Sequence, residues 1–176
     1  MLSCVDEVKD KQLDFIGDSI VARWDLAEYF PSFRTKNYGV SGSKIDYIES
    51  LSGQFANHTV VILTGTNDSH LMSEKNREVY ADRYVSAILN LKAEKIYLYS
   101  VLPRDMKTDR ENINEDIKQF NLLVKELIKK IDNIVYLDVY SDFLNNDEII
   151  QQYYNDGLHL SPFGYEVLTK SLLNVL

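Results

Sequence analysis

The chain has 176 residues, of which 45% are hydrophobic and 26% are charged, and its formal net charge is −8. This length fits one globular domain that buries roughly 70% of the surface of the unfolded chain. The negative charge argues against nucleic acid or an anionic membrane as a partner, because phosphate groups attract basic protein faces. No apolar run approaches the ~20 residues of a membrane helix, so we expect no membrane span.

The N-terminal segment "MLSCVDEVKDKQ" is rich in charged residues and lacks the apolar core of a secretory signal. We therefore expect a cytoplasmic protein with a single domain over residues 1–176, in which residues 1–11 are a short N-terminal extension. Cys4 is the one cysteine, so it cannot form an internal disulfide, and we interpret it as a residue without a catalytic role.

Short runs that are rich in apolar, β-branched and aromatic residues predict five strands. In chain order they occupy residues 12–17, 34–38, 58–64, 95–101 and 133–138. A helix is expected to begin near Ile20, directly after the first of these runs.

Helical patterns separate the later strands. The segment 76–92 places four apolar residues on one face, namely Tyr80, Tyr84, Ile88 and Leu91. The segment 111–130 places five apolar residues on one face, namely Ile113, Ile117, Phe120, Val124 and Leu127. A last helix is expected over about 162–175, because Ser161 suits an N-cap and Pro162 suits the first helical position.

This alternation predicts an α/β fold, a three-layer α/β/α sandwich around a five-stranded parallel sheet. Ligand sites in such sheets gather at the carboxyl ends of the strands. The segments that follow the five strands are Gly17-Asp18-Ser19, "GVSGSK" (39–44), "GTND" (65–68), "LPR" (102–104) and, after a longer interval, "YNDGLHLSPFGY" (154–165).

These segments contain a hydroxyl, an imidazole and a carboxylate. Ser19 becomes a nucleophile only if a neighbouring base takes its proton, and His159 is the candidate base. Asp156 is the candidate carboxylate that would orient the imidazole. Acyl transfer also needs donors to the oxyanion, for which the backbone N–H groups of Ser19 and Gly42 and the side-chain amide of Asn67 are candidates.

Each of these residues also has a purely structural interpretation. Ser19 can cap a helix, Gly42 can serve a turn, and Asn67 and Asp68 can form an Asx turn. Asp156 and His159 can form a hydrogen bond that caps the last helix. The catalytic interpretation is favoured because these separate signals fall on one predicted edge and together complete one mechanism.

Four segments in this order, "FIGDSI", "NYGVSG", "TGTND" and "DGLHLSPFGY", resemble the sequence blocks of the SGNH (GDSL-like) hydrolase family. The resemblance covers the chain from about residue 13 to about residue 168. It implies a nucleophile at Ser19, oxyanion donors at Gly42 and Asn67, an orienting carboxylate at Asp156 and a general base at His159. It further implies a flavodoxin-like sheet of order 2-1-3-4-5, and hydrolysis of esters or thioesters with no metal and no organic cofactor.

Two further residues are candidate substrate contacts. Trp24 follows the Ser19 segment, where it either forms a wall of the acyl site or packs into the core. Arg104 either contacts a carboxylate, phosphate or sugar of the substrate or is an ordinary surface arginine. His58 and His70 lack metal-ligand spacing with another histidine or cysteine, so we expect no zinc site.

The sequence therefore favours a serine esterase that acts on a small-molecule ester. The alternative from another class is a non-catalytic binding module that keeps the fold and holds an acylated or sugar-like ligand. The esterase is favoured because none of the five expected roles is vacant. Within the enzyme class, a sugar deacetylase or other small-acyl esterase competes with a lysophospholipase or thioesterase.

Overall fold

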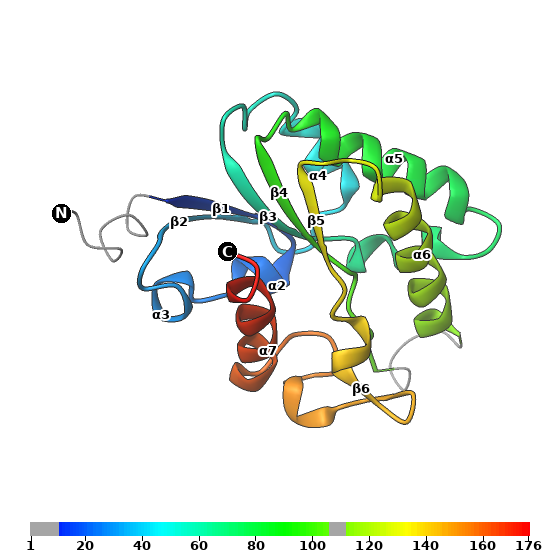
Figure 1. Ribbon diagram of the computed structural model, residues 1–176. Coiled ribbons are helices and arrows are strands. Elements are labelled where there is room, and N and C mark those ends of the chain that lie inside the picture. Colours follow the sequence, from blue (N-terminus) through cyan, green and yellow to red (C-terminus); the bar gives the residue numbers. More distant parts are fainter. Residues whose placement is uncertain (1–10, 106–111) are drawn as a thin grey trace.

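A computed structural model describes residues 11–105 and 112–176 of the chain (Figure 1). The expected N-terminal extension, residues 1–11, lies outside the described residues except for Lys11, and so does Cys4.

The five predicted strands form one parallel sheet of order β2-β1-β3-β4-β5, which confirms the expected fold class and strand order. The strands are β1 (Gln12–Gly17), β2 (Arg34–Gly39), β3 (Thr59–Leu63), β4 (Lys95–Tyr99) and β5 (Ile134–Leu137). In the register of the sheet, Gly17 at the end of β1 lies beside Gly39 of β2 and Leu63 of β3. The segments that follow these three strands therefore begin at one edge.

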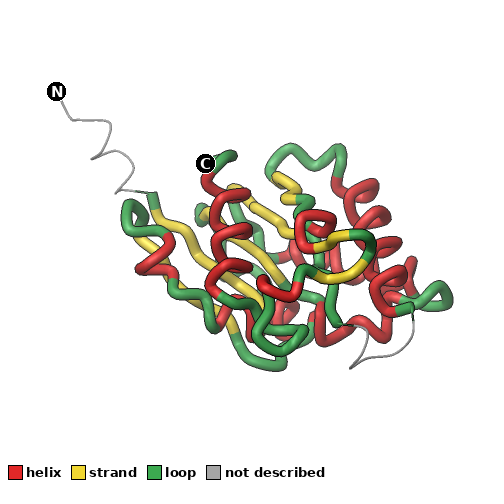
Figure 2. Tube along the Cα trace, turned by 90° about the horizontal axis from the view of Figure 1, so that it is seen from below, coloured by secondary structure: helices red, strands yellow, loops and turns green. Residues whose placement is uncertain are grey.

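Helices cover both faces of the sheet and complete the three layers (Figures 1 and 2). One face carries α2 (Ser19–Ala22), α3 (Leu26–Tyr29) and α7 (Pro162–Leu173). The other face carries α4 (Ile45–Ser50), α5 (Arg77–Asn90) and α6 (Ile113–Ile128). The expected N-cap of the last helix is confirmed, since the Ser161 hydroxyl accepts from the Gly164 N–H.

One residue of the predicted apolar face of α6 does not lie in the core. Leu127 is 39% exposed, whereas Ile128 is 4% exposed and packs in the core. The step of four residues from Val124 returns closer to the buried face than a step of three does, because a helix turns about 100° per residue.

Several short elements were not expected from the sequence. They are the 3₁₀ helices η1 (Thr66–Met72), η3 (Tyr140–Phe143) and η4 (Gln151–Tyr153), and a hairpin of β6 (Leu144–Asn145) and β7 (Glu148–Ile149). Asn146 and Asp147 join the two hairpin strands with φ angles of 50° and 63°. Two successive left-handed residues are typical of a type I′ turn, which asparagine and aspartate tolerate.

Trp24 lies in the core and not in a wall of the candidate site. It is 2% exposed and packs against four aromatic rings, with centroid distances of 5.4 Å to Phe15, 5.6 Å to Phe30, 6.1 Å to Tyr99 and 5.7 Å to Tyr165. The expectation that Trp24 contacts substrate is thus corrected, because burial of its large ring between α2, α3 and α7 leaves it no free face.

The turn from β1 into α2 depends on a residue without a side chain. A Cβ atom on Gly17 would lie 2.0 Å from the Leu63 carbonyl oxygen and 2.6 Å from Val21 Cγ2. Any side chain here would push β1 and β3 apart or displace α2. The glycine therefore lets the chain enter the helix directly beside the neighbouring strand.

Asp18 is the N-cap of α2 and carries a buried carboxyl group. Its Oδ1 accepts from the Ile20 N–H at 2.9 Å, and the residue is 1% exposed. Burial raises the pKa of Asp18 to about 6, although the hydrogen bond from Ile20 and the charge of His159 act in the opposite direction. Ionisation of Asp18 therefore costs the folded state more than the unfolded state.

We expect Asp18→Asn to stabilise the fold at pH 8 and not at pH 4. The pKa is 3.8 in the reference state and about 6 when folded, so the free energy of unfolding falls as the pH rises between these values. Asparagine keeps the capping oxygen but cannot ionise, which removes a penalty of up to about 3 kcal/mol. Urea unfolding of both proteins at the two pH values measures the difference.

Asp25→Asn is the matched control, because Asp25 also caps a four-residue helix through Oδ1 but is exposed to water. We expect no comparable pH-dependent gain in that variant. An equal gain in both variants, or none in Asp18→Asn at pH 8, would refute the burial argument.

Candidate active site

Ser19 is the first residue of α2, and its hydroxyl points to an imidazole that is remote in sequence. The Ser19 Oγ lies 3.0 Å from His159 Nε2. The side chain that caps α2 belongs to Asp18, so the interpretation of Ser19 as a helix cap is wrong. The serine hydroxyl is therefore available to the histidine.

His159 is held from its other side by Asp156. The His159 Nδ1 lies 2.7 Å from Asp156 Oδ2, and Asp156 Oδ1 accepts from the backbone N–H groups of His159 at 2.7 Å and Leu158 at 3.0 Å. The hydrogen bond from the imidazole, together with the two backbone bonds, lowers the pKa of Asp156 to about 2, and the imidazole has the largest effect. With a proton on Nδ1 facing the carboxylate, Nε2 keeps a lone pair for the Ser19 hydroxyl proton.

Side chains from other elements fix the short helix that carries Ser19. A helix of four residues is not stable alone, because starting a helix costs more free energy than the hydrogen bonds of a single turn recover. The Tyr165 hydroxyl of α7 donates to the Ile20 carbonyl at 2.8 Å, and Asn37 of β2 donates to the Val21 carbonyl at 2.8 Å. These bonds pair two carbonyl groups of α2 and join the helix to α7 in its own layer and to β2 of the sheet.

The segment that contains Gly42 lies against the end of β1. The Gly17 carbonyl accepts from the Val40 N–H at 2.9 Å and from the Ser43 hydroxyl at 3.1 Å. Among the described residues, no atom apart from those of its two chain neighbours lies within 4 Å of the place where a Gly42 Cβ would be. The structure thus brings the Gly42 segment next to the turn that leads into Ser19, with open space at Gly42.

Asn67 and Asp68 join the third segment to the second. Asn67 Nδ2 donates to the Ser43 carbonyl at 2.9 Å, which leaves the second amide proton of Asn67 for another acceptor. Asp68 is 2% exposed, and its Oδ2 accepts from the Ile45 N–H at 2.7 Å and the Tyr80 hydroxyl at 3.1 Å. The sequence missed this linking role of Asp68, for which the one available signal was its place directly after a buried strand.

Arg104 lies beside the same segment. Its Nη1 donates to the Thr66 carbonyl at 3.1 Å, and the residue is half-buried. The structure therefore gathers six of the seven residues singled out in the sequence at or beside one edge of the sheet, and places the seventh, Trp24, in the core.

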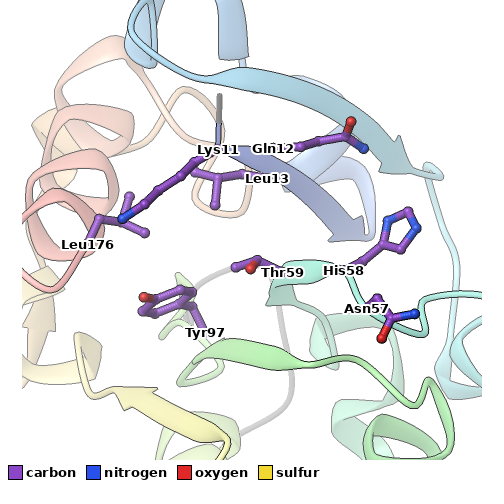
Figure 3. Close-up of a pocket in the computed structure, with 8 residues that line it drawn as sticks. All are labelled: Lys11, Gln12, Leu13, Asn57, His58, Thr59, Tyr97 and Leu176. Atoms are coloured by element: carbon purple, nitrogen blue, oxygen red, sulfur yellow. The ribbon is translucent and has the colours of Figure 1, made fainter. Parts of the chain in front are cut away.

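A second histidine and carboxylate pair lies at the opposite end of the strands. His58 Nδ1 is 2.5 Å from Asp14 Oδ2, and Gln12 donates to the other oxygen of Asp14 at 2.8 Å. A cavity of about 460 Å³ lies beside this pair, and its lining residues come from the starts of β1 and β3, from β4 and from Leu176 (Figure 3). The pair joins β1 to the start of β3, because Asp14 lies in β1 and His58 directly precedes Thr59.

Across the described ranges 11–105 and 112–176, no group of three or more His, Cys, Asp and Glu side chains is arranged to hold a metal ion. In the same ranges, no helix has the length and apolar composition needed to cross a membrane.

Solved structures with the same fold include several hydrolases. A protein from Streptococcus pneumoniae, provisionally identified as a platelet activating factor, is 27% identical with a TM-score of 0.77, over 93% of this chain and 83% of that one. A lipase/acylhydrolase from Enterococcus faecalis is 20% identical with a TM-score of 0.70, over 93% and 94%. An acetylxylan esterase from Geobacillus stearothermophilus is 20% identical with a TM-score of 0.67, over 94% of each chain.

No curated protein matches the chain in sequence. Residues 15–167 match the family described as GDSL-like lipase/acylhydrolase, and this span contains all four sequence blocks and the Ser19, His159 and Asp156 side chains. The chain belongs to the GDSL-like lipase/acylhydrolase family.

Proposed function

We propose that this protein is a serine hydrolase that cleaves carboxylic esters of small acyl groups through an acyl-enzyme. The observation that carries the proposal is the unbroken chain of short contacts from Ser19 Oγ through His159 to Asp156, at 3.0 Å and 2.7 Å. A hydroxyl, an imidazole and a carboxylate in this order supply a nucleophile, a base and a group that orients the base.

In the proposed reaction, His159 Nε2 takes the Ser19 proton while Oγ forms a bond to the ester carbonyl carbon. The carbonyl oxygen becomes an oxyanion, and the imidazolium is stabilised by the Asp156 carboxylate. His159 then returns the proton to the departing alcohol, which leaves the acyl group on Ser19. A water molecule, deprotonated by His159, attacks this ester in the same way and releases the acid.

The proposed donors to the oxyanion are the N–H groups of Ser19 and Gly42 and the free amide proton of Asn67. This assignment is supported by the hydrogen bonds that join the three segments. The Gly17 carbonyl accepts from the Ser43 hydroxyl at 3.1 Å, and the Asn67 amide donates to the Ser43 carbonyl at 2.9 Å. Donors that are fixed before the charge develops stabilise it without further reorganisation.

The surroundings of Gly42 favour an acetyl ester of a polar alcohol over a lysophospholipid. A hollow of about 430 Å³ borders Gly42, and it is lined mainly by polar side chains, namely Ser41, Ser43, Lys44, Asp46, Tyr47 and Ser50, with Val40. Hydroxyl and charged groups suit a sugar-like alcohol, whereas a long acyl chain needs an apolar groove. The acetylxylan esterase among the structural relatives is consistent with this substrate class.

We expect Ser19→Ala to abolish ester hydrolysis and to leave the fold intact. The variant loses the nucleophile, while the N-cap of α2 stays because Asp18 provides it. Turnover of p-nitrophenyl acetate and of acetylated sugars measures activity. A fluorophosphonate should label the wild-type protein at Ser19 and leave the Ser19→Ala variant unlabelled. Longer p-nitrophenyl esters and an acyl-CoA in the same panel separate the lipase and thioesterase alternatives.

Ser171→Ala is the control, since the Ser171 hydroxyl bonds to the Leu168 carbonyl within α7. It should keep both activity and labelling. Substantial turnover by Ser19→Ala would rule out the mechanism, and ligand binding by a wild-type protein without turnover would favour the binding module.

We expect Asn67→Ala to lower kcat by roughly 10²- to 10³-fold with a smaller change in KM, because a donor to the oxyanion acts mainly when charge develops. The control is Asn133→Ala, which loses a similar bond to the Ala93 carbonyl at the other end of the sheet. Both variants should lose some thermal stability, and only Asn67→Ala should lose kcat. A lower melting temperature with unchanged kcat would give Asn67 a structural role alone.

A further inference from the structure

The chain that leaves β4 is held by two asparagines of α6 and contacts two loops of the candidate site. We call residues 101–105 the exit segment. The N–H and carbonyl of Val101 both pair with the Asn121 amide, at 2.9 Å each. Those of Arg104 both pair with the Asn114 amide, at 2.9 Å and 2.7 Å. Each asparagine thus pairs with both the N–H and the carbonyl of one residue, as a neighbouring strand would, and fixes the exit segment in place.

On one side, the exit segment contacts the loop that carries Asp156 and His159. The Asp105 N–H donates to the Gly157 carbonyl at 2.9 Å, and the Tyr154 hydroxyl donates to the Pro103 carbonyl at 2.6 Å. Gly157 has a φ of +81°, and a Cβ there would lie 2.6 Å from Asp105 Cβ. The two backbones are therefore closer than any side chain at position 157 would permit.

On the other side, the exit segment reaches the Asn67 loop through the Arg104 side chain, which donates from Nη1 to the Thr66 carbonyl at 3.1 Å. The Thr66 carbonyl and the Asn67 N–H belong to one peptide group, which is planar. A bond that holds this oxygen therefore fixes the plane from which the Asn67 side chain starts.

We propose that Arg104 is a positioning residue that holds Asn67 against the developing oxyanion, and that it does not bind substrate. This inference rests on the proposed function. The exit segment connects the loop of the base to the loop of the oxyanion donor, so that Arg104 fixes the position of Asn67 relative to His159. A second bond, from Asn67 Nδ2 to the Ser43 carbonyl, also holds the amide.

The expected effect follows from the distance dependence of oxyanion stabilisation. Donors act when they lie about 2.7 to 3.1 Å from the oxyanion, and a displacement of about 1 Å can cost roughly 10²-fold in rate. Loss of the Arg104 bond leaves Asn67 present but less well placed. The loss should therefore appear in kcat and be smaller than the loss from deleting the Asn67 amide.

The test uses p-nitrophenyl acetate, whose small acyl and leaving groups carry no charge for a guanidinium to bind. We expect Arg104→Met to lower kcat by roughly 10- to 100-fold, with KM within about 2-fold of wild type. Arg104→Lys, which keeps a donor that can reach a carbonyl, should recover part of this loss. In the Asn67→Ala background, Arg104→Met should change kcat by less than about 2-fold, because the group through which it acts is absent.

Arg77→Met is the matched control. Arg77 donates from Nε to the Met72 carbonyl at 3.0 Å, which is the same kind of bond at the opposite end of η1, and it also pairs with Asp116. Its loss should lower the melting temperature at least as much as Arg104→Met and leave kcat unchanged. This comparison separates positioning of Asn67 from a general loosening of η1.

Three results would overturn the inference while Ser19-dependent turnover stands. A raised KM with unchanged kcat would make Arg104 a substrate contact. Equal losses from Arg104→Met with and without Asn67 would show independent action, and an equal kcat loss in Arg77→Met would indicate general destabilisation. A wild-type protein without ester hydrolysis would overturn the proposed function and this inference together.

Discussion

The close approach of β1 to β3 at Gly17 is the constraint on which the candidate site depends. Because the Leu63 carbonyl occupies the place of a side chain at residue 17, the chain can turn at once from the end of the central strand into α2. The next residue but one is Ser19, which thus stands directly at the carboxyl edge of the sheet. The same edge is where β2 and β3 end, so the Gly42 and Asn67 segments begin beside the serine.

Regular secondary structure ends at this edge, and side chains take over the pairing of backbone groups. Asp68 pairs with the Ile45 N–H, Asn67 with the Ser43 carbonyl, and Asn114 with both backbone groups of Arg104. A typical bond of this kind contributes about 1 kcal/mol, but leaving a buried backbone group unpaired costs more. Many bonds of modest strength therefore order the loops, and the loss of any one of them would leave a buried backbone group unpaired.

The strands and the longer helices could be predicted because periodicity is a property of neighbouring residues. Ser19 and His159 are remote in sequence, and their grouping with Asp156 was predicted from the shared edge of a parallel sheet and from the resemblance of four sequence blocks to a known family. The position of Trp24 was open between core and site, since an aromatic residue after a helix gives no sign of which layer it enters. Burial against rings from three other elements decided it.

The role of the exit segment could not be predicted, because it too depends on how elements pack against each other. Asn114 and Asn121 lie seven residues apart on the otherwise apolar inner face of α6, among Ile117, Phe120 and Val124, and both are buried. Two polar residues on such a face indicate buried hydrogen bonds. Their partners, the backbone groups of Val101 and Arg104, are set by how α6 packs on the sheet, which no spacing within the helix reveals.

Two carboxyl groups close to the Ser19 and His159 pair have pKa values that their surroundings shift in opposite directions. Hydrogen bonds lower the pKa of Asp156 to about 2, and burial raises that of Asp18 to about 6. Asp156 therefore stays charged throughout the mildly acidic range in which Asp18 changes its charge. The carboxylate that orients His159 therefore keeps its charge, and the carboxyl group that caps the helix of Ser19 is the one that changes charge with pH.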